Sequence, residues 1–360
     1  MKIARKEIMR IKPYVPGKPI DEVKRELGLD EAVKLASNEN AFPPSPRAIR
    51  AAKKALNYLN RYPDGGCFYL KKALAQRLGV APGNIVTGNG SDEIIILALR
   101  AFLKPGEEVI IAKPAFLVYE IAARVHGAKI RFAPLKNFRY DVKKAAALVT
   151  EKTRMIFLAN PHNPAGTYVT KGEIDFLVRK TPKKTILFFD EAYYEFAGGV
   201  RDFPRSLKYI ESRNVIVTRS FSKAYSLAGA RIGYGVARRA IIDCLNRSRE
   251  PFNVNSVAQA AALAALEDKK HAVKALEHIE KGKAFIYRGL DSMGLKYIPS
   301  VTNFILVNTG KKAGPVYRKL LKRGIIVRDM GAWKLDNFMR VTVGTMRENK
   351  KFIKALKQSL

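Results

Sequence analysis

The residue best placed to do chemistry in this chain is a lysine with serines on its N-terminal side. Lys223 ends the run Ser220-Phe-Ser222-Lys223, which follows an apolar segment. The spacing Ser220-x-x-Lys223 also matches the motif of serine β-lactamases, but the Ser-Asp-Asn and Lys-Thr-Gly segments of those enzymes do not occur. Because the chain has 66 Lys and Arg residues, one lysine decides nothing without partners elsewhere.

A glycine-rich turn offers the first partner, a possible phosphate site. The run Gly88-Asn-Gly-Ser91-Asp92-Glu93 joins an apolar segment to a predicted helix. Glycines let the backbone turn tightly, and a helix N-terminus presents free N–H groups to an anion. Glu93 stands where the dinucleotide fingerprint requires a third glycine, and no Gly-Lys-Ser/Thr of a P-loop follows.

Polar side chains also follow the other apolar segments. Asn163 lies in a proline-rich turn, and Asp190 with Tyr193 comes directly after the next segment. In open parallel sheets, ligands bind beyond the carboxyl ends of the strands. We therefore expect a phosphate cradle, an amide, a carboxylate with a tyrosine, and Lys223 to converge on one edge of the sheet.

The elements that must position these residues are predicted strands that alternate with helices. The strand segments are apolar throughout and rich in β-branched residues, as expected where both faces of a strand are covered. This alternation is typical of an α/β fold with a mainly parallel sheet. Ser45-Pro46 and the Thr345/Glu348 capping box predict two further helix starts. The predicted strands are 84–88, 108–112, 154–159, 184–189 and 214–218, and a helix is expected over 91–103.

The length of 360 residues suggests more than one domain. We expect an N-terminal arm with part of a small domain over 1–39, a large domain over 40–248, and a smaller α+β domain over 249–360. No apolar stretch is long enough to span a bilayer, and the charged start Met-Lys-Ile-Ala-Arg-Lys lacks an export signal. The two cysteines have no metal or redox spacing, so free thiols in a cytoplasmic protein are expected.

The net charge of +34 raises the question of nucleic-acid binding. The basic residues are spread along the chain, and neither zinc-finger spacing nor a basic region with heptads occurs. A solvated surface whose field favours small anions is the preferred interpretation, with nucleic-acid binding as the rejected alternative.

With these segments in view, the chain resembles the fold-type I aminotransferases that depend on pyridoxal 5′-phosphate (PLP). Within them it is most similar to the histidinol-phosphate aminotransferases. The resemblance runs from Lys34-Leu-Ala-Ser-Asn-Glu-Asn through Arg61-Tyr-Pro-Asp-Gly-Gly to Met339-Arg-Val-Thr-Val-Gly-Thr. It implies transamination between glutamate and histidinol phosphate in histidine biosynthesis, by a homodimer and without a metal.

The resemblance also implies roles for the PLP residues. Lys223 forms the Schiff base and moves the proton, while Asp190 keeps the pyridine nitrogen protonated. Asn163 and Tyr193 bind the ring hydroxyl, and Phe116 stacks on the ring. The cofactor phosphate is assigned to the backbone of Ser91 and Asp92, the hydroxyls of Ser220 and Ser222, the fork of Arg231, and Tyr62 of the second subunit.

Substrate residues follow from the same resemblance. Arg340 matches the arginine that binds the amino-acid carboxylate with both arms of its fork. Arg328 and Tyr14 are candidates for the distal phosphate or the γ-carboxylate, and Asn40 is expected in the same pocket.

Three alternatives stay open beside the nucleic-acid binder. An aromatic-amino-acid aminotransferase or a phosphothreonine-type decarboxylase would keep every PLP residue and differ only in the substrate pocket. A PLP-binding regulator without catalysis is the third, although the DNA-binding domain that such regulators carry is not evident in the sequence.

Overall fold

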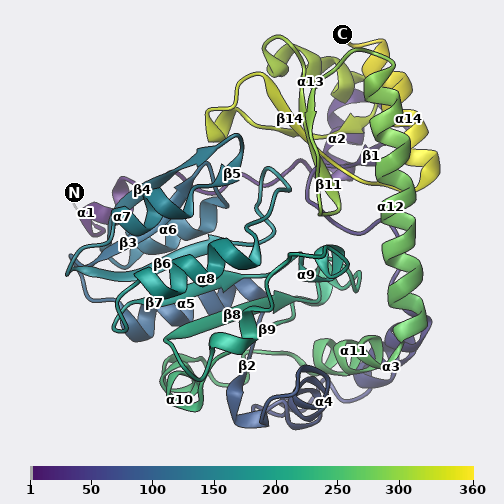
Figure 1. Ribbon diagram of the computed structural model, residues 1–360. Helices are drawn as coiled ribbons and strands as arrows, with labels where there is room; N and C mark the ends of the chain where they lie inside the picture. Colours follow the sequence, from purple (N-terminus) through teal and green to yellow (C-terminus); the bar gives the residue numbers. More distant parts are fainter. Residues whose placement is uncertain (1–2) are drawn as a thin grey trace.

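A computed structural model describes residues 3–360, which form an eight-stranded sheet, a four-stranded sheet and a two-stranded pair, with helices around them (Figure 1). The larger sheet has the strand order β2-β9-β8-β7-β6-β3-β4-β5. Strands β8, β7, β6, β3 and β4 run parallel, β9 lies antiparallel to both of its neighbours, and β5 is antiparallel at the edge. The strands are β2 (Ile85–Gly88), β3 (Glu108–Lys113), β4 (Lys129–Lys136), β5 (Arg139–Tyr140), β6 (Thr153–Ala159), β7 (Ile186–Asp190), β8 (Val215–Ser220) and β9 (Gly233–Val236). The expectation of a mainly parallel α/β sheet is confirmed.

Most side chains of the large sheet's strands are apolar, and both faces of several strands are covered. Every residue of β2, β7, β8 and β9 is buried. Helices α5 (Ser91–Phe102) and α6 (Leu117–Val125) pack against each other, as do α7 (Val142–Ala147) and α8 (Lys171–Lys180). The two pairs cross the sheet in opposite directions, so right-handed connections place them on opposite faces.

The smaller sheet is antiparallel, in the order β10-β11-β14-β13, and a separate parallel pair joins β1 to β12. These strands are β1 (Val33–Lys34), β10 (Tyr297–Ile298), β11 (Phe304–Asn308), β12 (Ile325–Ile326), β13 (Arg328–Asp329) and β14 (Phe338–Thr342). The β1–β12 pair ties the N-terminal segment to the C-terminal part of the chain. Figure 1 shows the 23-residue helix α12 (Lys269–Asp291) running from the large sheet's end of the molecule to this small sheet.

The remaining helices cover the outside of both parts. Helix α3 begins at Pro46, where the Ser45 hydroxyl accepts from the N–H of Arg47, and α14 begins with the predicted Thr345/Glu348 capping box. Helix α11 packs mainly on α3 and α4, beside the large sheet. These helices are α1 (Lys6–Met9), α2 (Ile20–Leu27), α3 (Pro46–Leu56), α4 (Phe68–Leu78), α9 (Tyr194–Ala197), α10 (Arg239–Ser248), α11 (Ser256–Glu267), α13 (Ala313–Lys322) and α14 (Met346–Lys357), with short 3₁₀ turns η1 (Pro82–Asn84), η2 (Ser206–Tyr209), η3 (Ala228–Ala230) and η4 (Gly331–Trp333).

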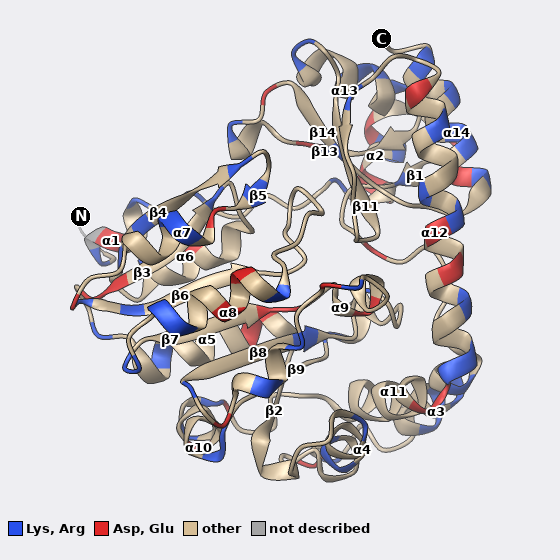
Figure 2. Cartoon of the chain, in the orientation of Figure 1, with Lys and Arg blue, Asp and Glu red and all other residues tan. Residues whose placement is uncertain are grey.

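The basic residues are distributed over both parts of the molecule (Figure 2). Over residues 3–360, no helix is both long and apolar enough to cross a bilayer. The same residues contain no cluster of His, Cys, Asp and Glu side chains suited to a metal ion.

Candidate active site

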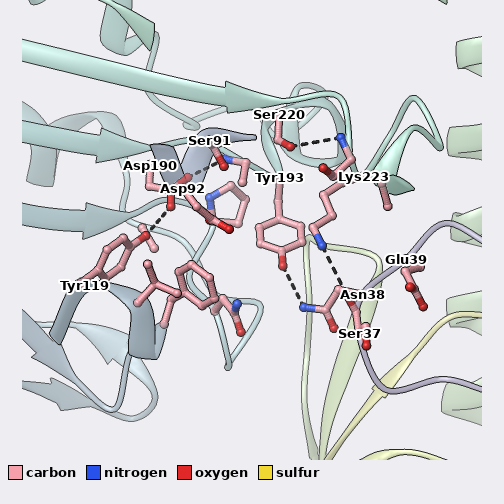
Figure 3. Close-up of a pocket in the computed structure, with 18 of the residues that line it drawn as sticks. Ser37, Asn38, Glu39, Ser91, Asp92, Tyr119, Asp190, Tyr193, Ser220 and Lys223 are labelled. Atoms are coloured by element: carbon pink, nitrogen blue, oxygen red, sulfur yellow. Dashed lines mark hydrogen bonds between the residues drawn. The ribbon is translucent and has the colours of Figure 1, made fainter. Parts of the chain in front are cut away.

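A cavity of about 470 Å³ lies where the carboxyl ends of the large sheet's strands meet the N-terminal segment and the small sheet. Twelve of the fifteen residues expected at the site line it: Tyr14, Ser91, Asp92, Phe116, Asn163, Asp190, Tyr193, Ser220, Ser222, Lys223, Arg231 and Arg340. The strand ends therefore converge as the sequence predicted. Figure 3 shows the side chains of Asp190, Tyr193 and Lys223 directed into this common space.

Lys223 extends from the turn after β8 toward the N-terminal segment. Its Nζ donates a hydrogen bond to the backbone oxygen of Ser37, 3.3 Å away (Figure 3). Burial and the nearby charge of Arg340 lower the pKa of Lys223 from 10.5 to about 8. Deprotonation at a lower pH makes the amine a nucleophile in the physiological range, which an ordinary lysine is not.

Asp190 ends β7 and is held by three donors. Oδ1 accepts from the N–H of Ala192 at 3.0 Å and from the hydroxyl of Thr218 at 3.3 Å, and Oδ2 accepts from the Tyr119 hydroxyl. Burial raises the pKa of Asp190 to about 6, and the hydrogen bond from Tyr119 opposes that shift. A cation at this position would stabilise the carboxylate form further.

A hydrogen-bonded group lies beside Lys223 in the cavity. Asn38 Nδ2 donates to the Tyr193 hydroxyl oxygen at 2.8 Å, and burial raises the pKa of Tyr193 to about 12. Arg340 Nη1 donates to Asn163 Oδ1 at 2.6 Å, and Nη2 donates to the backbone oxygen of Ala36 at 3.0 Å. The Tyr193 hydroxyl and the Asn163 amide therefore lie on the cavity wall, held by Asn38 and Arg340 respectively.

The buried Arg340 is not fully paired. Its Nε lies buried without a hydrogen-bond partner among the described residues, and burial lowers its pKa to about 10. An incompletely satisfied guanidinium in a cavity favours binding of an anion, since a carboxylate would fill the open donor positions.

The phosphate cradle is built by the close approach of β9 to the start of α5. A Cβ on Gly233 would lie 2.5 Å from the backbone nitrogen of Ser91, so only glycine allows this packing. Arg231 has a left-handed backbone with φ of 56°, which directs its fork to Ser222 Oγ at 3.3 Å and to within 3.6 Å of Asp92 Oδ2. Strained backbone of this kind concentrates at functional sites.

The donor set fits PLP group by group. The α5 N-terminus, two hydroxyls and the Arg231 fork suit a phosphate, as required at a helix start. A buried carboxylate, Asp190, suits a protonated ring nitrogen, and an amine with a lowered pKa, Lys223, suits an aldehyde. Phe116 supplies an apolar ring to the cavity wall.

Three expected site residues lie outside the cavity lining. Tyr62 is 82% exposed and stacks on Phe252 with ring centroids 4.6 Å apart. Arg328 is buried beneath the site, with its guanidinium carbon 5.7 Å from the Tyr14 ring centroid and 5.1 Å from that of Trp333. Asn40 Nδ2 donates to the backbone oxygen of Ala224, next to Lys223, at 3.3 Å.

The cavity lining also includes residues that sequence reasoning missed, and four of them make polar or aromatic contacts: Ser37, Asn38, Tyr119 and Trp333. Ser37 and Asn38 come from the segment Ser37-Asn-Glu-Asn40, where Asn40 had been identified but its neighbours had not. Tyr119 stands one helical turn after Phe116, and that spacing could have signalled a shared face. Trp333, the sole tryptophan, donates from Nε1 to the backbone oxygen of Ala115 at 2.7 Å.

Comparison with known proteins places this site in a family. The family profile "Aminotransferase class I and II" matches residues 30–356. Histidinol-phosphate aminotransferase of Moorella thermoacetica is 47% identical over 99% of this chain and 92% of that protein. Histidinol-phosphate aminotransferase 2 of Carboxydothermus hydrogenoformans is 46% identical over 99% of both chains.

Solved structures agree on the architecture. The crystal structure of histidinol-phosphate aminotransferase from Sinorhizobium meliloti, in complex with pyridoxal-5′-phosphate, superposes with a TM-score of 0.93. It is 29% identical and covers 100% of this chain and 98% of its own. Aspartate aminotransferase of Thermus thermophilus with maleate, at 22% identity and a TM-score of 0.87, shares the fold over the whole of both chains. The fold-type I expectation is thereby confirmed.

Proposed function

Since the chain belongs to the class I and II aminotransferase family, we propose that it transfers an amino group between glutamate and imidazole-acetol phosphate, yielding histidinol phosphate in histidine biosynthesis. Its cofactor is PLP. The observation that carries the proposal is the convergence of Lys223, Asp190 and Arg340 on one cavity, in a chain 47% identical to a histidinol-phosphate aminotransferase.

When bound, PLP supplies an electron-withdrawing pyridinium ring that stabilises negative charge on the substrate's α-carbon. We assign its phosphate to Ser91, Asp92, Ser220, Ser222 and Arg231, and its ring nitrogen to Asp190. The support is the chemistry of these donors and their position around a single cavity.

Lys223 Nζ is the group that holds and moves the proton. With a pKa lowered to about 8, it is able to accept a proton from the substrate α-carbon and return it at physiological pH. Asp190 stays ionised above about pH 6, and three donors fix both of its oxygens. Tyr193 stays protonated because its pKa is raised to about 12, and we assign it, with Asn163, to the ring hydroxyl.

We assign Arg340 to the α-carboxylate of glutamate, on the strength of its guanidinium charge in the cavity lining. Tyr14 lines the cavity, and Arg328 packs beneath Tyr14. We therefore assign these two to the γ-carboxylate or the distal phosphate, with Asn40 positioning the backbone beside Lys223. Both substrates are anions, so the net charge of +34 favours their capture.

We further propose that two copies form a homodimer in which Tyr62 of one copy completes the cofactor site of the other. Its support is the 82% exposure of Tyr62, which lies outside the cavity of its own chain. The cytoplasm is the compartment we propose, in keeping with the two free thiols of Cys67 and Cys244.

The test follows the absorbance of the bound cofactor in the purified protein. Glutamate alone should convert the lysine-bound form to the amine form, and imidazole-acetol phosphate should then convert it back. If glutamate converts the cofactor but imidazole-acetol phosphate does not convert it back, the protein is an aminotransferase with a different second substrate. Release of carbon dioxide from a phosphothreonine-type substrate would favour the decarboxylase alternative.

The Lys223→Ala variant tests the anchoring residue. It should lose the absorbance band of covalently bound cofactor and slow the half-reaction about a hundred- to ten-thousandfold. Survival of that band would show that another lysine holds the cofactor. The variant Lys143→Ala, which removes an exposed lysine outside the cavity, serves as the control.

A further inference from the structure

A second cavity, of about 700 Å³, opens beside the cofactor cavity and shares no lining residue with it. Its walls come from the end of α4, from α9 and the loop that follows it, from η2, and from β8. Volumes of this size are typical of small-molecule sites. The function proposed above makes no use of this cavity.

The cavity has a one-sided charge. Five cationic residues line it, namely Arg77, Arg201, Arg205, Lys208 and Arg219, whereas no Asp or Glu does. Cations that share a partly enclosed space repel one another, and the repulsion is relieved when an anion enters.

Among the described residues, two of these five cations form ion pairs with carboxylates outside the lining. The buried Arg219 pairs with Glu191 at 2.8 Å, and Lys208 pairs with Asp175 at 3.0 Å. Arg77 donates to the backbone oxygen of Leu266. Within residues 3–360, Arg77, Arg201 and Arg205 make no ion pair. The buried Glu195 lies close enough to Arg77 for their charges to interact, so the guanidinium groups of Arg201 and Arg205 are the main charges left for a ligand.

We propose that this cavity, lined by Arg77, Arg201, Arg205, Lys208 and Arg219, binds a small anion that carries a phosphate group. Arginine forks match phosphate oxygens two at a time, which a chloride ion cannot exploit. The volume leaves room for more than inorganic phosphate, so the ligand class is a phosphorylated small molecule.

The position of Arg219 connects this site to the cofactor cavity. Arg219 lies in β8 between Thr218, which donates to Asp190, and Ser220, which lines the cofactor cavity. Alternate residues of a strand point to opposite faces, so Arg219 faces the second cavity while its two neighbours face the first. Its partner Glu191 likewise follows Asp190 directly. The proposed anion site and the cofactor cavity are therefore separated by the thickness of strand β8 at this point.

The experiment titrates the PLP-loaded protein with inorganic pyrophosphate by calorimetry, at an ionic strength held constant with sodium chloride. The cofactor then occupies the phosphate cradle at Arg231. The double variant Arg201→Ala/Arg205→Ala should bind pyrophosphate at least about tenfold more weakly, a change of about 1.4 kcal/mol. The control Arg179→Ala/Arg318→Ala removes the same charge from exposed positions outside both cavities and should bind like the parent.

Three results would overturn the proposal. Absence of pyrophosphate binding to the parent protein excludes an accessible phosphate site. Equal weakening in the two double variants shows a diffuse effect of net charge, and equal binding by all three proteins places the anion elsewhere. Thermal unfolding of each variant confirms the native state, which exposed Arg201 and Arg205 are not expected to affect.

Discussion

At the residue scale, burial shifts the pKa values of an acid and a base of this site in opposite directions. Burial raises the pKa of the Asp190 carboxyl to about 6 and lowers the pKa of the Lys223 amine to about 8. The carboxylate is therefore ionised and a fraction of the amine is neutral near pH 7, which is the combination that the proposed chemistry needs. Neither shift is visible in the sequence, since both depend on packing.

Tyr119 is the residue whose removal tests the Asp190 assignment. Its hydroxyl donates to Asp190 Oδ2 and counteracts the rise in the pKa of that carboxyl. Tyr119→Phe should therefore raise this pKa above 6 and move the acidic limb of cofactor binding to higher pH. A hydrogen bond to a charged group contributes about 1.5–3 kcal/mol, so cofactor affinity at pH 7 should fall at least about tenfold.

The control for this change is Tyr140→Phe. Tyr140 has a buried hydroxyl without a hydrogen-bond partner among the described residues, so its loss should leave both cofactor affinity and its pH profile unchanged. Equilibrium titration of the apoprotein with PLP between pH 5 and 8 measures both variants. If the acidic limb of the pH profile of PLP affinity is unchanged in Tyr119→Phe, Tyr119 does not influence the ionisation of Asp190.

Arg340 should set the protonation of Lys223 as well as bind substrate. After burial, the charge of Arg340 is the largest cause of the lowered pKa of Lys223. Arg340→Met should raise that pKa above 8, because the amine gains stability in its charged form. The rate at which apoprotein captures PLP through Lys223 should rise with pH through a midpoint near 8 in the parent and through a higher midpoint in the variant. A lower midpoint in the variant would contradict this sign.

The residues that sequence reasoning missed share one property, which is that another segment brings them to the site. Tyr119 lies 71 positions from Asp190, and its place in α6 resembles that of an ordinary core tyrosine. Asn38 reaches Tyr193 from 155 positions away. Strand ends could be predicted from apolar segments, whereas contacts between segments depend on tertiary packing.

At the element scale, the strands predicted from continuous apolar segments were all found, within two residues at each end. The other strands were not predicted, and for β4 and β9 the reasons are physical. β4 lies near the sheet edge, contains Pro134 and exposes part of its side chains, so it lacks the continuous apolar signal. β9 reads Gly-Tyr-Gly-Val, and glycines usually indicate a turn rather than a strand.

The same glycines explain why β9 has this sequence. A Cβ on Gly233 would lie 2.5 Å from the Ser91 nitrogen and 2.8 Å from the Gly90 carbonyl carbon. Gly233→Ala should push α5 away from the phosphate cradle, lowering the free energy of unfolding by about 1–3 kcal/mol and weakening PLP binding. Denaturant unfolding and PLP titration measure the two effects.

Gly172→Ala is the matched substitution. Gly172 lies in α8, and nothing stands within 4 Å of the added carbon, so alanine should be neutral or stabilise the helix by about 0.5–1 kcal/mol. If Gly233→Ala behaves like Gly172→Ala, the close approach of β9 to α5 has no role in building the cradle.

At the scale of the whole molecule, the sequence left two properties open: where the positive charge gathers and whether the protein is oligomeric. The net charge of +34 gave no location, whereas the structure gathers five cationic residues around one cavity and spreads the others widely (Figure 2). Oligomeric state is the second property. It depends on surface shape, and the sequence alone supported it only through the resemblance of Tyr62.

Exposed apolar side chains near α3 and α4 bear on the oligomeric state. Between the end of α3 and the start of α4, five large side chains are at least 60% exposed: Tyr58, Leu59, Tyr62, Phe68 and Tyr69. Large apolar side chains exposed in this number within one short segment are typical of an interface, and in a twofold dimer the same face of each copy is used. We expect the parent protein to be dimeric through this face.

The variant Leu59→Glu/Tyr69→Glu tests that expectation. Two carboxylates on each copy would be desolvated and brought close together, so sedimentation at fixed salt should show a monomer. The monomer should also bind PLP more weakly, because Tyr62 of a second copy no longer reaches the cofactor site. Leu27→Glu, a similar change at the exposed end of α2, should stay dimeric and bind PLP normally. If the variant is monomeric but binds PLP as tightly as the parent, the dimer interface is supported and the role of Tyr62 in the cofactor site is excluded. If the parent protein is itself a monomer, both the interface and the role of Tyr62 are refuted.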